Sequence, residues 1–139
     1  MSTISLQIIT PLGALINEEA SFVVVPTISG EVTIYPHHIP LISVIQAGEL
    51  TIATELGRRP VAVWNGVLEV KQENEKTIVI LLVDRSEDAK SIDLDRAEAA
   101  YKRAEELKNM SSVGDIDFAR FEALMDKELN RIKIAKKYR

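Results

Sequence analysis

The strongest signals for the fold of this chain lie in the stretch Gly30-Glu31-Val32-Thr33-Ile34-Tyr35-Pro36-His37-His38-Ile39-Pro40-Leu41. Val32 and Ile34 face one way along an extended segment and the residues between them face the other, which is typical of a strand with one buried face. Pro36 ends this strand because proline has no N–H to donate to a sheet, and Pro40 favours an extended backbone just before it. The stretch therefore predicts a strand that leads into a rigid, exposed corner, followed by another strand.

Similar short apolar segments fill the rest of the first 84 residues. Turn signals rich in glycine, proline and asparagine separate them at close spacing, which is the pattern of an all-β sandwich. The predicted strands are residues 6–10, 20–26, 31–35, 41–46, 49–55, 60–64, 67–71 and 77–83.

The composition of the chain changes near Asp84. Residues 1–83 hold 8 acidic and 4 basic side chains, whereas residues 84–139 hold 13 of each, and the apolar period changes from two to about 3.6. The second part predicts two helices, residues 92–108 with Ser91 as cap and residues 116–137 with Asp115 as cap, joined as an antiparallel hairpin. We expect a β-sandwich domain over residues 1–84, a linker over 85–91 and a two-helix hairpin over 92–139.

Each predicted helix carries an apolar stripe that would face the other helix. Small residues dominate the first stripe and large ones the second, so the two would fit together. The stripe residues are Ala97, Ala100, Ala104 and Leu107 on the first helix, and Phe118, Phe121, Met125, Leu129 and Ile132 on the second.

The totals exclude several classes of protein. A net charge of −4 argues against a nucleic-acid binder, since that affinity comes mainly from neutralising phosphates. The chain has no cysteine, which excludes disulfides and thiolate chemistry and suits a reducing, cytoplasmic setting. No apolar run approaches the roughly 20 residues of a membrane helix, and the N-terminus has no signal-peptide pattern. We therefore expect membrane association only through a partner, with no direct insertion.

Signatures of catalysis are absent from the sequence. The six glycines compose neither a phosphate loop nor a dinucleotide fingerprint, and no catalytic serine or zinc-protease motif occurs. His37 and His38 are the only histidines, and as neighbours on an extended stretch they would point in opposite directions, without further metal ligands. We expect no catalytic residue, no metal site and no required cofactor, with the histidines in structural or contact roles.

The segment Ile92-Asp93-Leu94-Asp95-Arg96-Ala97 stands out at the start of the first predicted helix. Asp93 and Arg96 are three residues apart on one face, and Arg103 follows on the same face seven residues later. From residue types alone this is an ordinary first-turn carboxylate with intrahelical ion pairs. The basic C-terminal run 131–139 likewise complements the dipole of the second helix without any partner.

A strand followed by P-x-H-x-P-L, with G-E ahead of it, resembles the N-terminal domain of the ATP synthase epsilon family, whose mitochondrial counterpart is called delta. The segment 65–70 is similar to the family's G-G-x-L-E-V strand, although Asn65 departs from the first glycine. The resemblance implies a rotor subunit of the central stalk that docks on the gamma subunit and the c-ring. It implies a rotor interface at Glu31, Tyr35, Pro36, His37, His38, Pro40 and Leu41.

The resemblance also implies a nucleotide-binding role for the segment from Ile92 to Ala97. Many bacterial members of the family carry I/L-D-x-x-R-A at this point as the signature of an ATP site on the hairpin, which makes ATP a regulatory ligand. The residues that match or lie nearest to this site are Glu87, Ile92, Asp93, Arg96, Ala97, Arg103 and Arg131. The sequence departs from the family in the middle of the second helix, where tight binders have arginines and this chain has Asp126, Lys127, Glu128 and Asn130.

The resemblance implies a regulatory role for the hairpin. Extended along gamma, it would block ATP hydrolysis by engaging the catalytic beta and alpha subunits through basic residues of its second helix. These are Arg131, Lys133, Lys136, Lys137 and Arg139. The expected location is peripheral, at the cytoplasmic face of a bacterial plasma membrane, or on the stromal side of a thylakoid if the source is a plastid. Two alternatives stay open: a free-standing ATP-sensing module and a generic β-sandwich adaptor.

Overall fold

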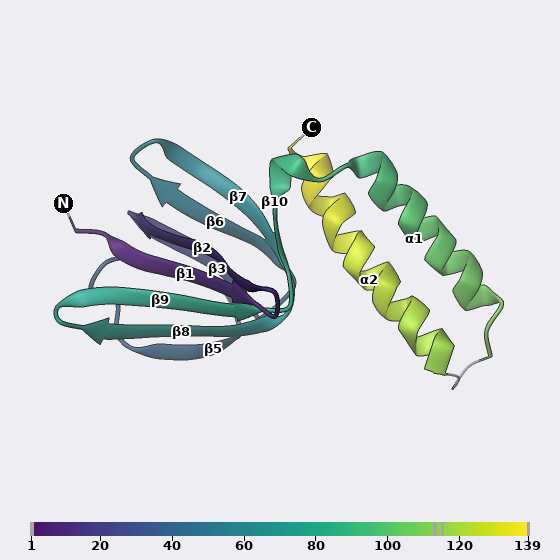
Figure 1. Cartoon of the computed structure of the whole chain (residues 1–139), viewed down its shortest axis with the longest axis horizontal. Coiled ribbons are helices and arrows are strands. Elements are labelled where there is room, and N and C mark those ends of the chain that lie inside the picture. Colours follow the sequence, from purple (N-terminus) through teal and green to yellow (C-terminus); the bar gives the residue numbers. More distant parts are fainter. Residues whose placement is uncertain (1, 113, 115, 139) are drawn as a thin grey trace. The chain divides into compact units, whose positions relative to one another are not determined.

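The computed structural model describes residues 2–112, 114 and 116–138, with the side chains of residues 14 and 15 left aside. The chain divides into two compact units, Met1–Asp88 and Ala89–Arg139. The first unit holds the strands and the second holds the helices, so the fold class predicted from the sequence, a β-sandwich followed by a helical hairpin, is confirmed (Figure 1).

The first unit is one sheet that folds over on itself. Strands β1 and β9 run parallel to each other, and the other paired strands run antiparallel. The order of strands is β10-β7-β6-β3-β5-β8-β9-β1-β2, with β4 paired to β3. The strands are β1 (Ile4–Thr10), β2 (Gly13–Ala20), β3 (Phe22–Thr27), β4 (Gly30–Ile34), β5 (Leu41–Ile45), β6 (Gly48–Thr54), β7 (Gly57–Val63), β8 (Gly66–Glu73), β9 (Lys76–Val83) and β10 (Ser86–Asp88).

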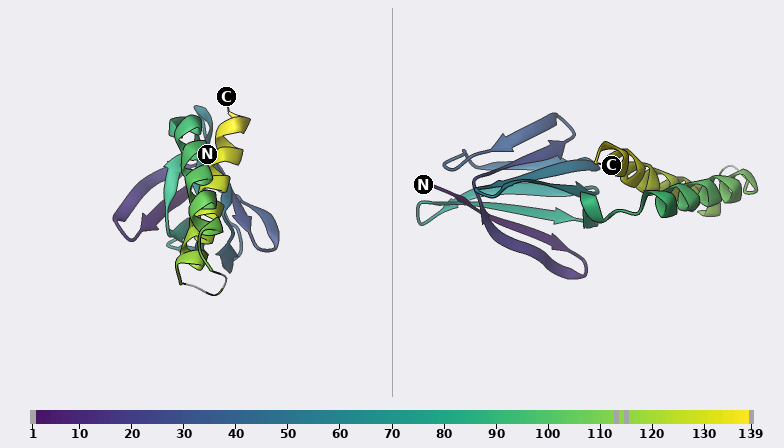
Figure 2. Two further views of the ribbon diagram at one scale, coloured as in Figure 1. Left: turned by 90° about the vertical axis from the view of Figure 1, so that its right-hand side faces the viewer. Right: turned by 90° about the horizontal axis from the view of Figure 1, so that it is seen from above.

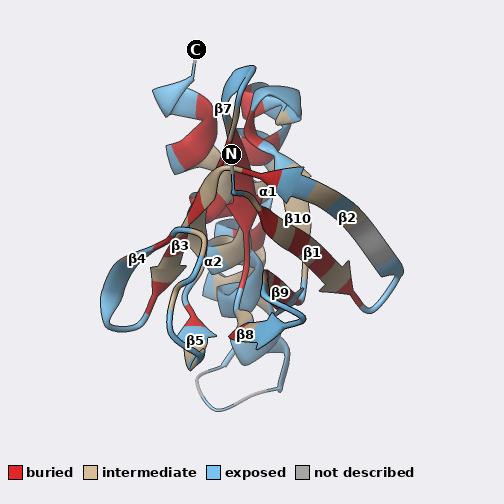
Figure 3. Cartoon of the chain, turned by 90° about the vertical axis from the view of Figure 1, so that its left-hand side faces the viewer, coloured by how far each residue is buried: buried red, intermediate tan, exposed pale blue. Residues whose placement is uncertain are grey.

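The core of the sandwich follows from alternation along these strands. In β1 every second residue is buried, which places Ile4, Leu6 and Ile8 on one face, and Figure 3 shows the alternation as bands along the strand. All residues of the main core cluster lie between Ile4 and Val83. The sandwich unit therefore contains a complete apolar core of its own.

Two strands of the structure, β2 and β10, are not among those predicted from the sequence. Strand β2 carries the polar run Asn17-Glu18-Glu19 just before its last residue, Ala20, and this run lacks the apolar alternation of a half-buried strand. Among the strands that the structure describes, β2 pairs with β1 and lies at the edge of the sheet. Strand β10 lies in the segment for which the sequence predicts a linker. Its three polar residues extend the sheet by pairing with β7, and Ser86 lies opposite Val63. Both strands form because a neighbouring edge offers hydrogen bonds.

Gly66, at the start of β8, is required by close packing of the backbone. A Cβ atom there would lie 2.0 Å from the carbonyl oxygen of Leu82 on the neighbouring strand. Beside it, the side-chain oxygen of Asn65 accepts a hydrogen bond of 3.1 Å from the N–H of Ala47. Asn65, which departs from the family pattern, therefore holds the turn that precedes β6.

The second unit is a pair of helices joined by a short loop. It consists of a short 3₁₀ turn η1 (Ala89–Ser91), helix α1 (Leu94–Asn109) and helix α2 (Ile116–Lys137). Figures 1 and 2 show α1 and α2 side by side. The bounds predicted for the second helix are confirmed, whereas its predicted cap, Asp115, lies outside the described residues.

The predicted cap of the first helix, Ser91, is wrong. Asp93 caps α1: its backbone is extended, and its Oδ1 accepts a hydrogen bond of 3.1 Å from the N–H of Arg96. Ser91 instead ends the 3₁₀ turn. An ionised aspartate is a good cap and also favours the positive end of the helix dipole, which explains why the helix begins two residues later than predicted.

The predicted stripe on α1 is largely sheltered from solvent. Ala97 and Ala104 are buried and Ala100 and Leu107 are half-buried. On α2 the aromatic stripe residues are half-buried, but Leu129 is 36% exposed. Near the loop the Lys108 ammonium lies 5.1 Å from the centre of the Phe118 ring, which joins the ends of the two helices.

Candidate functional site

The corner after β4 is a hydrogen-bonded turn. The N–H of His38 donates to the carbonyl oxygen of Tyr35 over 3.1 Å, so that Pro36 and His37 occupy its two central positions. His37 has a φ of 70°. Proline fixes a negative φ at the first central position, and a positive φ at the second then identifies a type II turn.

This turn contradicts the extended backbone that was expected at His37. The prediction that the rings of His37 and His38 point in opposite directions assumes an extended backbone at both residues, but His37 lies in the left-handed region. His37 is exposed and His38 is half-buried, and the Nδ1 of His38 lies 2.7 Å from the carbonyl oxygen of Ile39. No group of three or more metal-binding side chains occurs among the described residues.

Several side chains of the corner reach solvent. Ile39 is 74% exposed and Tyr35 is 55% exposed. The Tyr35 ring lies 4.9 Å from the ring of Phe22, and the Arg58 guanidinium lies 5.3 Å from that second ring. Glu31 is exposed on β4, opposite Pro26. The corner thus presents an isoleucine and an aromatic ring held by its neighbours, and the Glu31 carboxylate lies near the opposite end of β4.

The structure adds an apolar surface that sequence reasoning missed. Ile42, Val44, Val67 and Leu82 on strands β5, β8 and β9 are 73%, 48%, 41% and 52% exposed. Val67 lies opposite both Val44 and Leu82 in the strand register, so these three side chains form one row across the sheet. We call these four residues the apolar face; it continues directly from the corner because β5 begins at Leu41.

One signal in the sequence could have revealed the apolar face. In the segment Leu41-Ile42-Ser43-Val44-Ile45 apolar residues occur at both odd and even positions, although β5 has only one buried face. A strand whose solvent side is apolar as well indicates a further contact.

The residues of the predicted nucleotide site belong to both units. Glu87 lies in the sandwich unit, in β10, whereas Asp93, Arg96 and Arg103 lie in the hairpin unit. Asp93 serves as the helix cap, and Arg96 and Arg103 are both exposed on α1. Ile92 is half-buried and Ala97 is buried. The two exposed guanidinium groups are thus the strongest candidates for binding phosphate.

Glu87 and Arg131 each have a partner of opposite charge. Glu87 Oε1 lies 2.6 Å from a guanidinium nitrogen of Arg85, and Arg131 Nη1 lies 3.0 Å from Glu128 Oε1. A nucleotide that used either side chain would compete with these ion pairs.

The basic residues predicted for the inhibitory helix lie on the last turns of α2. Lys133, Lys136 and Lys137 are exposed, and the Lys137 ammonium lies 5.5 Å from the centre of the Tyr138 ring. Arg139 lies outside the described residues. In the part of the chain that the structure describes, no helix is long and apolar enough to cross a membrane.

Comparison with family models matches both units. The model described as ATP synthase, Delta/Epsilon chain, beta-sandwich domain matches residues 3–89. The model described as ATP synthase, Delta/Epsilon chain, long alpha-helix domain matches residues 90–136.

Curated relatives match along nearly their whole length. A protein named ATP synthase epsilon chain from Desulforamulus reducens is 39% identical over 130 residues, which cover 94% of this chain and 95% of the relative. One of the same name from Dehalococcoides mccartyi is 37% identical over 139 residues, covering 100% of this chain and 96% of the relative.

Solved structures share the fold at low sequence identity. A chain of the Euglena gracilis mitochondrial ATP synthase, in a structure described as OSCP/F1/c-ring, has a TM-score of 0.66 at 17% identity and covers 98% of this chain and 79% of its own. A chain from the Tetrahymena thermophila mitochondrial enzyme, described as central stalk/cring, has a TM-score of 0.63 at 16% identity and covers 96% and 95%.

Proposed function

Because the chain belongs to the ATP synthase delta/epsilon family, we propose that it works as a non-catalytic subunit of the central stalk in a proton-translocating F-type ATP synthase. In this role its sandwich docks on the gamma subunit and the c-ring, and it passes rotation between the ring and the catalytic head. The curated relatives carry the name of this subunit, and one solved neighbour is described as central stalk and c-ring.

The observation that carries the proposal is the apolar face next to the corner. When a partner covers exposed aliphatic side chains that lie in one row across a sheet, the complex is stabilised by about 25 cal/mol per Å² of apolar surface removed from water. Ile42 and Val44 lie on β5, which begins directly after the corner. A single partner surface can therefore cover both the corner and the apolar face. We place the rotor interface at this combined surface, with Glu31 at its border.

The test is binding of the full chain to a reconstituted complex of gamma and the c-ring. Val44→Asp puts a charge at one end of the apolar row, directly opposite Val67, and should lower the affinity at least about tenfold, because the carboxylate would be buried without a partner. Leu56→Asp is the matched control, since Leu56 is 99% exposed in the loop between β6 and β7. Equal affinity of the two variants would remove the apolar face from the interface.

The hairpin is proposed as the regulator of ATP hydrolysis. Its support is the family relationship together with the exposed lysines on the last turns of α2, which suit an acidic surface on the catalytic beta or alpha subunits. Removal of residues 92–139 should raise the rate of ATP hydrolysis by the assembled enzyme and leave assembly intact. An unchanged rate in a fully assembled enzyme would eliminate the inhibitory role.

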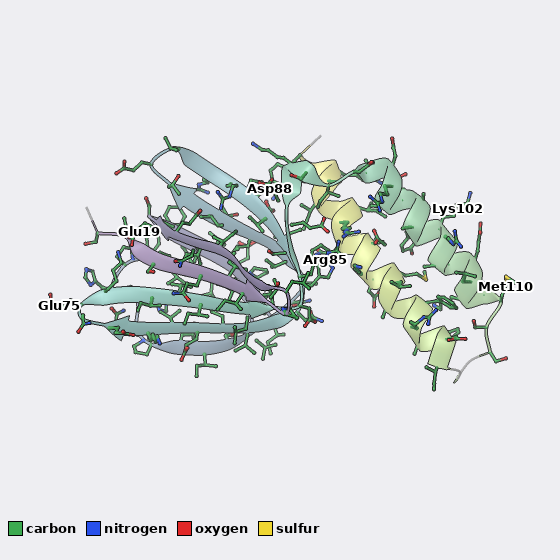
Figure 4. The ribbon with its side chains drawn as sticks, viewed as in Figure 1. Glu19, Glu75, Arg85, Asp88, Lys102 and Met110 are labelled. Atoms are coloured by element: carbon green, nitrogen blue, oxygen red, sulfur yellow. The ribbon has the colours of Figure 1, made fainter. Side chains whose placement is uncertain are left out.

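ATP is proposed as a regulatory ligand of the hairpin. Exposed Arg96 and Arg103 lie seven residues apart on α1, which places both guanidinium groups on one face, where they can reach phosphate oxygens. Calorimetric titration of the full chain with ATP tests this. Arg96→Ala should abolish the heat, whereas Lys102→Ala, which removes the same charge from the same helix (Figure 4), should not. If the unaltered chain gives no heat of binding, ATP is not a ligand and only the mechanical role remains.

The proposed location follows from the proposed partners. A chain that binds the c-ring is held at the surface of the membrane that contains the ring. For a bacterial enzyme this is the cytoplasmic face of the plasma membrane. Fractionation with and without the ring subunits tests it: the chain should leave the membrane fraction when the ring is missing.

A further inference from the structure

We propose that Thr77 on β9, assisted by Gln72 on β8, is the positioning residue that holds the turn at residues 35–38 in its type II form. The part of this inference that concerns binding rests on the proposed function, in which the corner contacts the rotor. The part that concerns the turn stands on the structure of the sandwich unit alone.

The turn uses a residue poorly suited to its shape. A type II turn needs a positive φ at its second central position, where glycine or asparagine normally stands, and here His37 adopts 70°. The alternative type I turn is open to histidine without this strain. Interactions from outside the turn must therefore favour type II.

Thr77 supplies the first of these interactions. The N–H of His37 donates to Thr77 Oγ1 over 2.7 Å, across 40 positions of sequence. In a type I turn the peptide between Pro36 and His37 is rotated by about half a turn, which would point this N–H elsewhere. Thr77 is only 2% exposed, so water cannot readily take the place of its hydroxyl.

Gln72 closes the network from the other side. Thr77 Oγ1 donates to Gln72 Oε1 over 3.1 Å, and Gln72 Nε2 donates to the carbonyl oxygen of His38 over 2.7 Å. That carbonyl can only accept, which sets the orientation of the glutamine amide. The amide oxygen then accepts the Thr77 proton, and this leaves a lone pair of the hydroxyl for His37. The three hydrogen bonds begin and end in the corner.

The β8–β9 ladder explains why these two side chains meet. Gln72 and Thr77 lie directly opposite each other in the register, and the two strands are joined by a two-residue loop with Glu75 near its tip (Figure 4). Gln72 is exposed and Thr77 is buried. Thr77 therefore carries most of the effect, and Gln72 orients its hydroxyl.

The turn itself is tested by NMR on the full chain. Thr77→Val keeps the β-branched shape and removes the hydroxyl. It should weaken the strong Pro36 Hα to His37 H–N Overhauser effect of a type II turn and speed amide exchange at His37 about tenfold or more. Thr77→Ser keeps a hydroxyl and should preserve both signals. Unchanged signals in a folded Thr77→Val variant would overturn the proposal.

Two further variants keep the test decisive if Thr77→Val folds poorly. Gln72→Met alters an exposed residue and should speed exchange at His37 by a smaller factor. His37→Gly removes the strain, so the double variant His37→Gly, Thr77→Val should regain the type II turn. A double variant that stays in the altered turn, or a Gln72→Met variant with unchanged exchange, would contradict the network.

Binding to gamma and the c-ring separates this inference from the proposed function. Thr77→Val should lower the affinity about tenfold and Thr77→Ser should restore it, because the corner keeps its shape only with the hydroxyl. A lost turn with unchanged affinity would remove the corner from the interface and leave the positioning role intact. An intact turn with lowered affinity would overturn the positioning role.

Discussion

Asp93 has a structural duty that is independent of any nucleotide. Its carboxylate caps α1 by accepting from the Arg96 N–H, so its replacement leaves a helix N-terminus with one fewer partner. The same residue belongs to the segment that resembles an ATP signature. A loss of nucleotide binding in an alanine variant would therefore be ambiguous.

Asp93→Ala should lower the stability of the hairpin by about 1 kcal/mol, whereas Asp93→Asn should lower it by much less because asparagine is also a good cap. Urea unfolding followed by far-UV circular dichroism measures the difference. Asp95→Ala is the control, since Asp95 lies in the first turn but is not the cap. Identical unfolding of the Asp93→Ala and Asp95→Ala variants would contradict the capping role. Asp93→Asn is then the variant for ATP titrations, because it keeps the cap and loses the charge.

Glu19 should contribute to the acid sensitivity of the sandwich. The Lys76 ammonium donates to Glu19 Oε2 over 2.5 Å, and the Thr3 hydroxyl donates to the same oxygen. Figure 4 marks Glu19 on β2. These hydrogen bonds, that of Lys76 foremost, lower the pKa of Glu19 below its ordinary value of 4.5. Their contribution to stability is complete above that value and disappears as the pH falls through the lowered pKa.

Lys76→Met should therefore lose less stability on acidification than the unaltered chain. The difference between the two chains in free energy of unfolding lost on acidification should stay below about 1 kcal/mol, because the Lys76–Glu19 pair is largely exposed to solvent. Unfolding free energies measured by urea at neutral pH and at about pH 3 check it. Lys71→Met, which removes the same charge from the neighbouring strand, is the control. Equal acid sensitivity of Lys76→Met and the unaltered chain would show that the ion pair has no part in it.

At the scale of an element, the β8–β9 hairpin has a turn that glycine would suit better. Asn74 and Glu75 form its two-residue loop, between the paired residues Glu73 and Lys76, and both have positive φ, 53° and 64°. These are the values of a type I′ turn, whose preferred sequence is Asn-Gly. Glu75 is therefore strained.

Glu75→Gly should raise the stability of the sandwich by about 0.5–1 kcal/mol, because it relieves the strained backbone. Thermal unfolding followed by Trp64 fluorescence measures this, since Trp64 is the only tryptophan and lies in the sandwich unit. Glu55→Gly is the matched control. Glu55 lies in another hairpin turn and has no positive φ, so glycine there should destabilise. Equal effects of the two substitutions would contradict the strain argument.

At the scale of the whole molecule, the sandwich should fold without the hairpin. Its core cluster comes entirely from residues between Ile4 and Val83, and β10 is its last strand. The position of the boundary matters, since the sequence predicts a domain that ends at residue 84 and therefore lacks β10.

A fragment of residues 1–88 should unfold cooperatively and should be about 1–3 kcal/mol more stable than a fragment of residues 1–84. The difference comes from the hydrogen bonds of β10 with β7 and the bond of 3.1 Å from the Trp64 N–H to the Arg85 carbonyl oxygen. Urea unfolding followed by Trp64 fluorescence measures both fragments. Equal stability would mean that β10 is dispensable, and failure of both to fold would mean that the sandwich depends on the hairpin.

The sequence by itself determined the features whose causes lie within a few residues. Alternation produced the eight predicted strands, the two prolines placed the corner, and the change of period marked the hairpin and the bounds of α2. Each of these depends on steric and hydrogen-bonding preferences of a residue and its near neighbours. The resemblance through the corner motif led to the family that the comparisons support.

Only the tertiary structure decided the features that need a partner from a distant part of the chain. Strands β2 and β10 exist because an edge was available, and Gly66 is required because Leu82 passes close to it. The form of the corner depends on a hydroxyl 40 positions away, and the apolar row depends on the register of three strands. Register brings residues together regardless of their separation in sequence, so local preferences could not reveal these contacts.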